Sequence, residues 1–139
     1  MKRAALLAAC LLLAAPFAGR ADDSLFEELG GRDKISAFTE DLVDRVVKDP
    51  RVAHFFTETD LPRFHDRLTD MFCHLAGEKR RFRGANMKYA HEGFGITDAD
   101  FNAVVEDLEK AMDDYEVPWS TQARLLAVLA PLKASIVEK

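Results

Sequence analysis

Histidine and cysteine are the residue types in this chain that point to metal or nucleophilic chemistry. They are His54, His65, His74, His91, Cys10 and Cys73. No pair of histidines has the spacing, with an intervening carboxylate, of a zinc protease, and the cysteines do not form a metal-binding pair. A Gly-x-Ser-x-Gly nucleophile elbow is also missing from the sequence. Hydrolase chemistry therefore has little support.

His91 has the most distinctive setting of the four histidines. It ends a short helical piece expected over residues 86–91, and Glu92-Gly93-Phe94-Gly95 follows it. The two glycines allow the backbone to turn sharply behind the histidine. A single histidine near a helix end is more often a surface residue or a partner of the helix dipole than a metal ligand. Its own spacing therefore leaves both interpretations open.

The elements that must position these residues are helices, because helix signals recur along the chain and strand signals are absent. Apolar periodicity and capping residues predict helices over residues 24–29, 33–48, 60–76, 86–91, 98–116 and 120–137. Pro131 is expected to remove a backbone hydrogen bond and bend the last helix. The fold class is therefore predicted to be all-α, with the two long C-terminal helices antiparallel and two long middle helices packed across them.

The first 21 residues have the pattern of an export signal. Lys2 and Arg3 precede an apolar run of 12 residues, and small residues at Gly19 and Ala21 suit cleavage after Ala21. The run is too short to cross about 30 Å of hydrocarbon comfortably, so no stable membrane span is expected. We expect a periplasmic or secreted domain of residues 22–139. A lipoprotein modified at Cys10 is the less favoured alternative.

The composition of residues 22–139 excludes some partners and bonds. They hold 16 basic and 24 acidic side chains, a formal charge of −8. A chain of this sign repels nucleic acid, so no nucleic-acid partner is expected. Cys73 would be the only cysteine left, which excludes an internal disulfide. Its helical, apolar setting predicts a buried and inert thiol.

Six stretches, in this order and spacing, resemble the truncated haemoglobins, the two-over-two globins, and specifically their group 1. The resemblance covers about residues 25–137 and implies a two-over-two helical sandwich around haem b. The stretches are Leu25-Phe26-Glu27-Glu28-Leu29-Gly30-Gly31, Val46-Val47-Lys48-Asp49-Pro50-Arg51, His54-Phe55-Phe56, Arg83-Gly84-Ala85-Asn86-Met87-Lys88-Tyr89-Ala90-His91, Gly95-Ile96-Thr97-Asp98-Ala99-Asp100-Phe101 and Leu129-Ala130-Pro131-Leu132.

By this resemblance, His91 matches the proximal iron ligand and is the predicted metal ligand. Phe56 matches the aromatic residue that packs on the haem face, and Phe82 stands where the family often has a tyrosine near the propionates. A basic cluster over residues 79–83 is either a partner of the propionates or a solvated loop. The predicted haem-binding residues are Phe56, Phe64, Leu68, Phe72, Phe82, Met87, His91, Ile96 and Phe101.

The side of the haem that would face a ligand departs from the family. Many group 1 members place a tyrosine and a glutamine there, at the positions of Val43 and Leu68, and Phe64 is also expected to face the ligand. O₂ gains from nearby hydrogen-bond donors, whereas CO and NO gain less, so fast O₂ release is expected. Arg67 either folds inward or contacts a propionate or solvent. His65 is expected to point away from the side of Arg67.

The sequence thus predicts a haem b protein that binds a diatomic gas (O₂, NO or CO) through His91, with an unidentified reductant as a further partner. One alternative is a haem-dependent NO dioxygenase or peroxidase-like enzyme, against which the apolar distal residues argue. The other is a haem-free helical interaction module. Retention of His91 and Phe56 argues against that module.

Overall fold

The computed structural model describes residues 21–80, 82, 84 and 86–138, and within these residues it contains helices and no strand. The all-α prediction is confirmed. None of the helices in the described part is long and apolar enough to span a bilayer. Of the expected export signal, residues 1–21, all but Ala21 lie outside the described residues. The elements are α1 (Ala21–Glu28), α2 (Gly31–Lys48), η1 (Ala53–Phe56), α3 (Leu61–Leu75), α4 (Met87–His91), α5 (Asp98–Asp114), α6 (Trp119–Leu129), η2 (Ala130–Leu132) and α7 (Lys133–Ile136).

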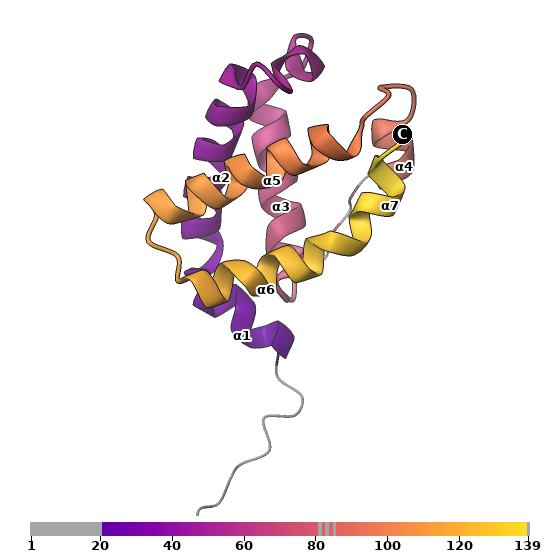
Figure 1. Ribbon diagram of the computed structural model, residues 1–139. Coiled ribbons are helices and arrows are strands. Elements are labelled where there is room, and N and C mark those ends of the chain that lie inside the picture. The colour runs from indigo at the N-terminus through magenta and orange to yellow at the C-terminus, as the bar shows by residue number, and fades with distance from the viewer. Residues whose placement is uncertain (1–20, 81, 83, 85, 139) are drawn as a thin grey trace, which may run out of the picture.

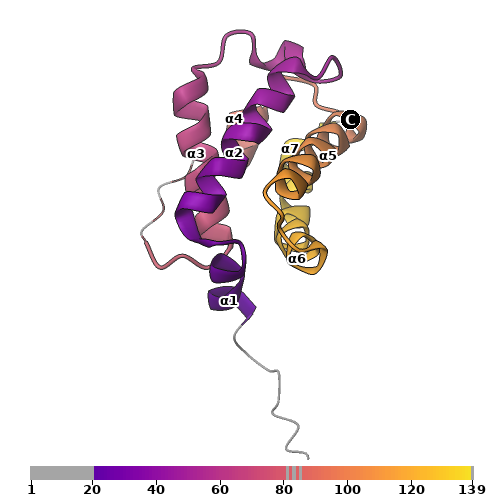
Figure 2. The ribbon, with the colours of Figure 1, turned by 90° about the vertical axis from the view of Figure 1, so that its left-hand side faces the viewer.

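The long helices form two layers of two. α2 packs along α3 in one layer, and α5 and α6, joined by a short turn, run antiparallel in the other (Figure 1). Turned by 90°, the molecule shows the α2–α3 pair on the left and the α5–α6 pair on the right (Figure 2). α5 crosses α2 and α6 contacts α3. This arrangement is the predicted two-over-two sandwich.

The core between the layers follows from the apolar stripe of α2. Ile35, Phe38 and Leu42 recur at helical spacing and are at most 2% exposed. The Phe38 ring lies 6.4 Å from that of Phe72 on α3, between centroids. Full burial of such side chains contributes about 1.5–3 kcal/mol each. α2 is therefore the central helix of the core, and the helices that pack against it are those that cover this apolar stripe.

The helix ends agree with the sequence at most positions. α5 begins with a capping box in which Thr97 and Asp100 each accept a hydrogen bond from the other's backbone N–H, at 3.1 and 3.0 Å. α1 begins at Ala21, earlier than the expected start at Ser24. α6 ends at Leu129, and a short 3₁₀ turn containing Pro131 leads to α7. The bend expected at Pro131 is confirmed, because proline has no N–H to continue the ladder.

Cys73 lies on α3 with no exposed surface. Burial raises the pKa of its thiol to about 12, so the sulfur is protonated at neutral pH and is a poor nucleophile. The predicted buried thiol is confirmed.

Candidate functional site

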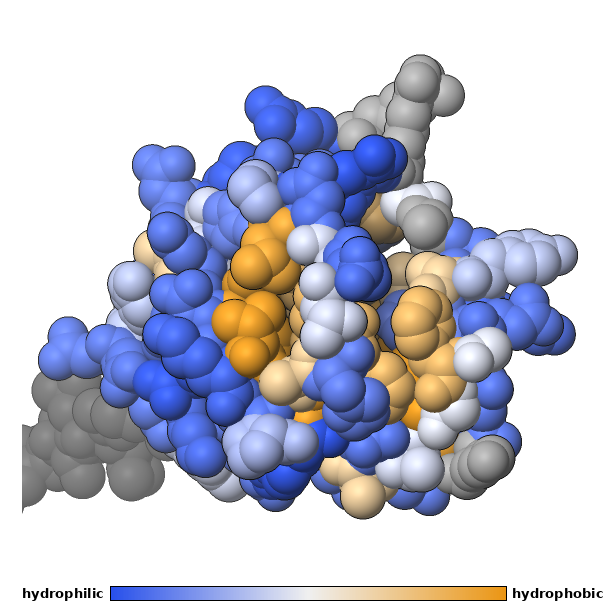
Figure 3. Space-filling view, turned by 90° about the horizontal axis from the view of Figure 1, so that it is seen from above, coloured by the Kyte–Doolittle hydropathy of each residue, from blue (hydrophilic) through white to orange (hydrophobic). Residues whose placement is uncertain are grey.

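A large apolar cavity lies between the two layers. Its volume is about 720 Å³, within the range of small-molecule and cofactor pockets of roughly 300–1,000 Å³. Figure 3 views the molecule from above and shows apolar side chains gathered in the middle of that face, with hydrophilic ones around them. All nine residues predicted to bind haem line this one cavity: Phe56, Phe64, Leu68, Phe72, Phe82, Met87, His91, Ile96 and Phe101.

His91 lines one side of the cavity from the end of α4. Its Nδ1 lies 2.7 Å from the backbone carbonyl oxygen of Met87, one turn earlier. A carbonyl oxygen only accepts, so Nδ1 donates and carries the proton. In the neutral ring the lone pair is then on Nε2, which is the state a metal requires of an imidazole. The backbone of α4 thus fixes the tautomer of the predicted ligand.

The wall formed by α2 and α3 is mostly apolar, with Arg63, Arg67 and Asp70 of α3 as its charged members. Phe64 and Leu68 line the cavity from α3, and the Phe64 ring lies 5.3 Å from that of Phe56, between centroids. Leu42 and Val46 line it from α2, whereas Val43 is buried but is not among the lining side chains. The expectation that Val43 faces the ligand was wrong. Leu42 and Val46 are four residues apart and share one face, and Val43 lies about 100° around the helix from Leu42.

The opposite wall comes from the second layer and from the loop after His91. Phe101 lines it from the first turn of α5, and the ammonium of Lys133 lies 5.6 Å from the centre of its ring. Phe94 meets Phe55 edge to face, with 6.4 Å between ring centroids. The remaining lining residues of this wall are Ile96, Val104, Val105, Leu108, Leu129, Leu132 and Ile136.

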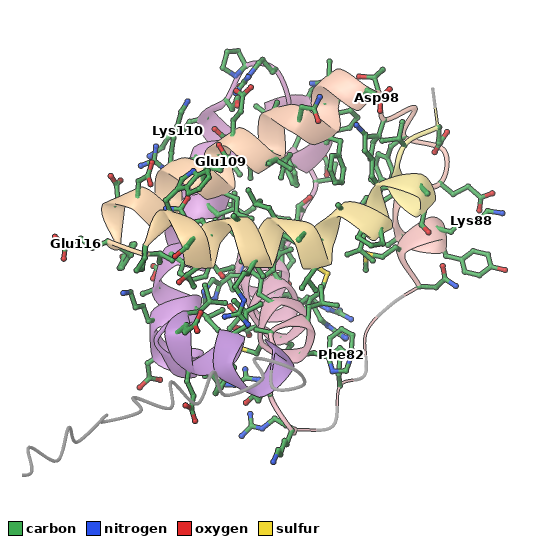
Figure 4. The ribbon with its side chains drawn as sticks, turned by 60° about the horizontal axis from the view of Figure 1, so that its bottom comes forward. Phe82, Lys88, Asp98, Glu109, Lys110 and Glu116 are labelled. Carbon is green, nitrogen blue, oxygen red and sulfur yellow. The ribbon has the colours of Figure 1, made fainter. Side chains whose placement is uncertain are left out.

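Phe82 lines the cavity from the segment between α3 and α4 (Figure 4). The ring of His74 stacks on it, with centroids 4.6 Å apart and planes at 14°. A Cβ at Gly84 would lie 2.1 Å from the Phe82 ring, so this ring position requires glycine there. The Phe82 ring is thus packed between the imidazole of His74 and the backbone of Gly84.

The cationic groups at the cavity come from α3. Arg63 and Arg67, one helical turn apart, both line it. In the basic cluster over residues 79–83, for which a propionate partner and a solvated loop were both open, Lys79 and Arg80 are exposed and do not line the cavity. Arg81 and Arg83 lie outside the described residues. Arg63 was not predicted to reach the cavity, although its spacing of four from Arg67 places both residues on one helix face.

The other three histidines do not line the cavity. His65 donates from Nε2 to the backbone oxygen of Ser36 on α2, at 2.9 Å, which agrees with the expectation that it points away from Arg67. His54 and His74 are exposed. His91 is therefore the one histidine of the four that can bind a metal inside the cavity.

The residues present fit a haem. A flat apolar macrocycle needs aliphatic and aromatic walls, its iron needs a neutral imidazole, and its two carboxylates need cationic partners at the edge. The cavity provides all three. Its walls are largely apolar, His91 offers the lone pair of Nε2, and Arg63 and Arg67 supply the cationic guanidinium groups. Fold and site together define a haem pocket between two crossed helix pairs.

Comparison with known proteins agrees with this class. A model of the family described as bacterial-like globin matches residues 24–138. A group 1 truncated haemoglobin of Mycolicibacterium paratuberculosis is 31% identical over 113 residues, covering 81% of this chain and 83% of the relative. One from Tetrahymena pyriformis is 31% identical over 94 residues, covering 68% of this chain and 78% of the relative. The chain belongs to the globin family and, within it, to the group 1 truncated haemoglobins.

Solved structures give the same result. The truncated haemoglobin of Tetrahymena pyriformis in its Fe(III) form matches with a TM-score of 0.79 and 27% identity, covering 83% of this chain and 98% of that one. The 2/2 haemoglobin of a Synechococcus species, in the cyanomet state and with covalently attached haem, matches with a TM-score of 0.77 and 26% identity, over the same shares. The cofactor of this chain is therefore haem. The contacts of individual side chains with haem remain predictions.

Proposed function

We propose that this chain is a haem b protein that binds a diatomic gas at an iron held by His91, with an apolar distal side. The observation that carries the proposal is the hydrogen bond from His91 Nδ1 to the Met87 carbonyl, inside a cavity whose facing wall is apolar. When bound, the haem supplies an iron coordination position at which a diatomic gas binds.

His91 would hold the iron through Nε2, because its other nitrogen is committed as a donor to the Met87 carbonyl. This hydrogen bond also increases the basicity of the ligating nitrogen and fixes the ring plane. Arg63 and Arg67, which line the cavity, would pair with the haem carboxylates. Phe56 and Phe64 exclude water from the ligand side with their packed rings.

The distal wall determines which gas is favoured. Leu42, Phe64 and Leu68 offer no hydrogen-bond donor. A donor stabilises O₂ by roughly 0.5–3 kcal/mol, so its loss speeds O₂ release. CO and NO are less polar and lose less. The same wall favours gas binding over specialised NO dioxygenation, which needs groups that position its reactants.

The first test is an absorption spectrum of haem-reconstituted protein. The unchanged chain is expected to show a Soret band. In His91→Ala that band is expected to be lost or strongly shifted, with haem retention falling by at least tenfold. His54→Ala is the matched control, because His54 is exposed and does not line the cavity. No Soret band, or an unchanged one in His91→Ala, would contradict the proposal.

Export is a second part of the proposal, supported by Lys2 and Arg3 before the apolar run and by the small residues before Asp22. After expression of the full chain in a bacterium, mass spectrometry of the periplasmic fraction is expected to find a polypeptide that begins at Asp22. Cys10→Ala is the control and should not change this result. A full-length cytoplasmic product, or a lipid on Cys10, would contradict it.

A further inference from the structure

The last described residue of the chain contacts the loop that follows His91. The carboxylate of Glu138 accepts a hydrogen bond from the backbone N–H of Gly93, at 2.7 Å through Oε1. The backbone N–H of Glu138 donates to the carbonyl of Ile96, at 2.9 Å. Two hydrogen bonds from one residue therefore tie the loop near both of its ends, and Ile96 itself lines the cavity.

Neighbouring contacts hold the same two parts of the chain together. Lys133 of α7 forms an ion pair with Asp98 at 3.0 Å, and its ammonium lies over the Phe101 ring. α7 packs against α4, and Figures 1 and 4 show the two helices beside each other at the edge of the molecule. Glu138 thus adds to the contacts that already join α7 to α4 and to the start of α5.

The element that carries His91 needs such external support. α4 has five residues, far fewer than the roughly 12–15 at which an isolated helix becomes marginally stable in water. The chain leaves it through Gly93 and Gly95, at φ of +88° and +65°, and glycine loses more conformational entropy on ordering than other residues. Within the loop, the N–H of Phe94 reaches the His91 carbonyl only at 3.4 Å. The orientation of His91 must therefore depend on contacts from outside.

We propose that Glu138 is a positioning residue for His91, acting through the Gly93 amide and the Ile96 carbonyl. This inference rests on the proposed role of His91 as the iron ligand. A carboxylate is suited to this task because a hydrogen bond with a charged acceptor is stronger than one between neutral groups. The C-terminal segment, which is distant from His91 in sequence, thereby limits how far the imidazole can tilt.

The first experiment uses the haem-free protein, so that it does not depend on the iron. Amide hydrogen exchange at Gly93, followed by NMR, is expected to be about three- to tenfold faster in Glu138→Ala than in the unchanged chain. Glu138→Gln keeps an acceptor oxygen and should restore part of the protection. Glu109→Ala is the matched control, because Glu109 lies on α5 away from α4 (Figure 4). Exchange that is equal in Glu138→Ala and Glu109→Ala would overturn the proposal.

The second experiment uses the ferrous haem protein. Resonance Raman spectroscopy is expected to show an iron–histidine stretching band that broadens or shifts in Glu138→Ala, recovers in Glu138→Gln and does not change in Glu109→Ala. Haem loss to an acceptor protein should quicken about two- to fivefold in Glu138→Ala. An unchanged band would overturn the positioning role, even if the thermal midpoint falls. If the unchanged chain has no iron–histidine band, the proposed function fails, whereas the Gly93 exchange rate still reports on this contact.

Discussion

The two sides of the cavity are built by different kinds of interaction. On the side of His91, directional polar contacts follow one another: the Met87 carbonyl fixes the imidazole, and Glu138 holds the loop through Gly93. On the opposite side, Leu42, Val46, Phe64 and Leu68 offer only apolar surface.

The difference reflects what each side must do. A metal ligand has to present one lone pair in one direction, and hydrogen bonds provide direction where hydrophobic burial does not. The side that admits a small gas needs a space of suitable shape from which water is excluded, and packed apolar groups provide both. Substitutions on the apolar side should therefore change ligand kinetics without loosening the haem, whereas those on the His91 side should change haem attachment.

The largest effect should come from a donor placed on the apolar side. Leu68→Gln is expected to slow O₂ release by about tenfold or more, because one hydrogen bond to the ligand is worth on the order of 1–2 kcal/mol. Stopped-flow displacement of O₂ measures the rate. Haem retention should be unchanged, since His91 is not altered.

Leu68→Met is the control for this substitution, because it conserves volume and adds no strong donor. Its O₂ release should stay within about twofold of the unchanged protein. Equal slowing in Leu68→Met and Leu68→Gln would show that packing, and not polarity, sets the rate. Release from the unchanged protein that is slower than from relatives with the tyrosine–glutamine pair would also contradict the comparison.

Much of this architecture was predictable from the sequence because its signals are local. The apolar period of α2, the start of α5 at Asp98 and the bend at Pro131 depend on neighbouring residues, and all three are confirmed. The whole-chain resemblance assigned residues that are distant in sequence to one haem site, and all nine predicted site residues line one cavity.

The remainder depends on details that local patterns do not determine. Val43 and Leu42 are adjacent in sequence, and the rotation of α2 decided which of them lines the cavity. The contact of Glu138 with Gly93 spans 45 residues and joins an exposed side chain to a backbone amide, so apolar periodicity could not predict it. Arg63 was missed because its one signal, the spacing of four from Arg67, predicts a shared helix face but not that this face lines a cavity.

A charged cluster, which we call the joint, lies between the end of α2 and α5, beside the apolar wall. It consists of Asp49, Arg51, Asp107 and Lys110. Asp107 is only 4% exposed, and its Oδ2 has no hydrogen-bond donor. Burial and the carboxylate of Asp49 at the end of α2 raise the pKa of Asp107 to about 6, although Arg51 and Lys110 oppose this. Hydrogen bonds from Arg51, and then from Asp107, lower the pKa of Asp49. The two carboxyl groups therefore share one proton below about pH 6.

Asp107→Asn should produce the next largest effect, on stability. Because the pKa of Asp107 is higher in the folded chain than the value of about 4 expected when unfolded, its contribution is complete below about pH 4 and is lost as the pH rises through 6. The asparagine variant always presents a donor to Asp49. Its free energy of unfolding should exceed that of the unchanged protein by about 1 kcal/mol at pH 7.5 and equal it near pH 4.5.

Urea unfolding of the haem-free proteins at the two pH values measures this difference. Asp44→Asn is the control, because it removes an exposed carboxylate from the same end of α2 and should show no such pH dependence. A lower stability of Asp107→Asn at pH 7.5 would mean that the ionised pair, held by Arg51 and Lys110, stabilises the joint. O₂ release should stay within twofold, because the joint does not contribute a donor to the apolar wall.

The smallest effect is expected at His65, and it tests whether the apolar side lacks a second iron ligand. His65 is on α3, the helix of Phe64 and Leu68, but its Nε2 donates to the Ser36 carbonyl at 2.9 Å, and the ring does not line the cavity. His65→Gln keeps an N–H donor for that carbonyl. The ferric and ferrous absorption spectra should therefore be unchanged between pH 5.5 and 8, and stability should fall by less than about 1 kcal/mol. A change from six- to five-coordinate spectra in His65→Gln would show that α3 swings this imidazole inward to the iron.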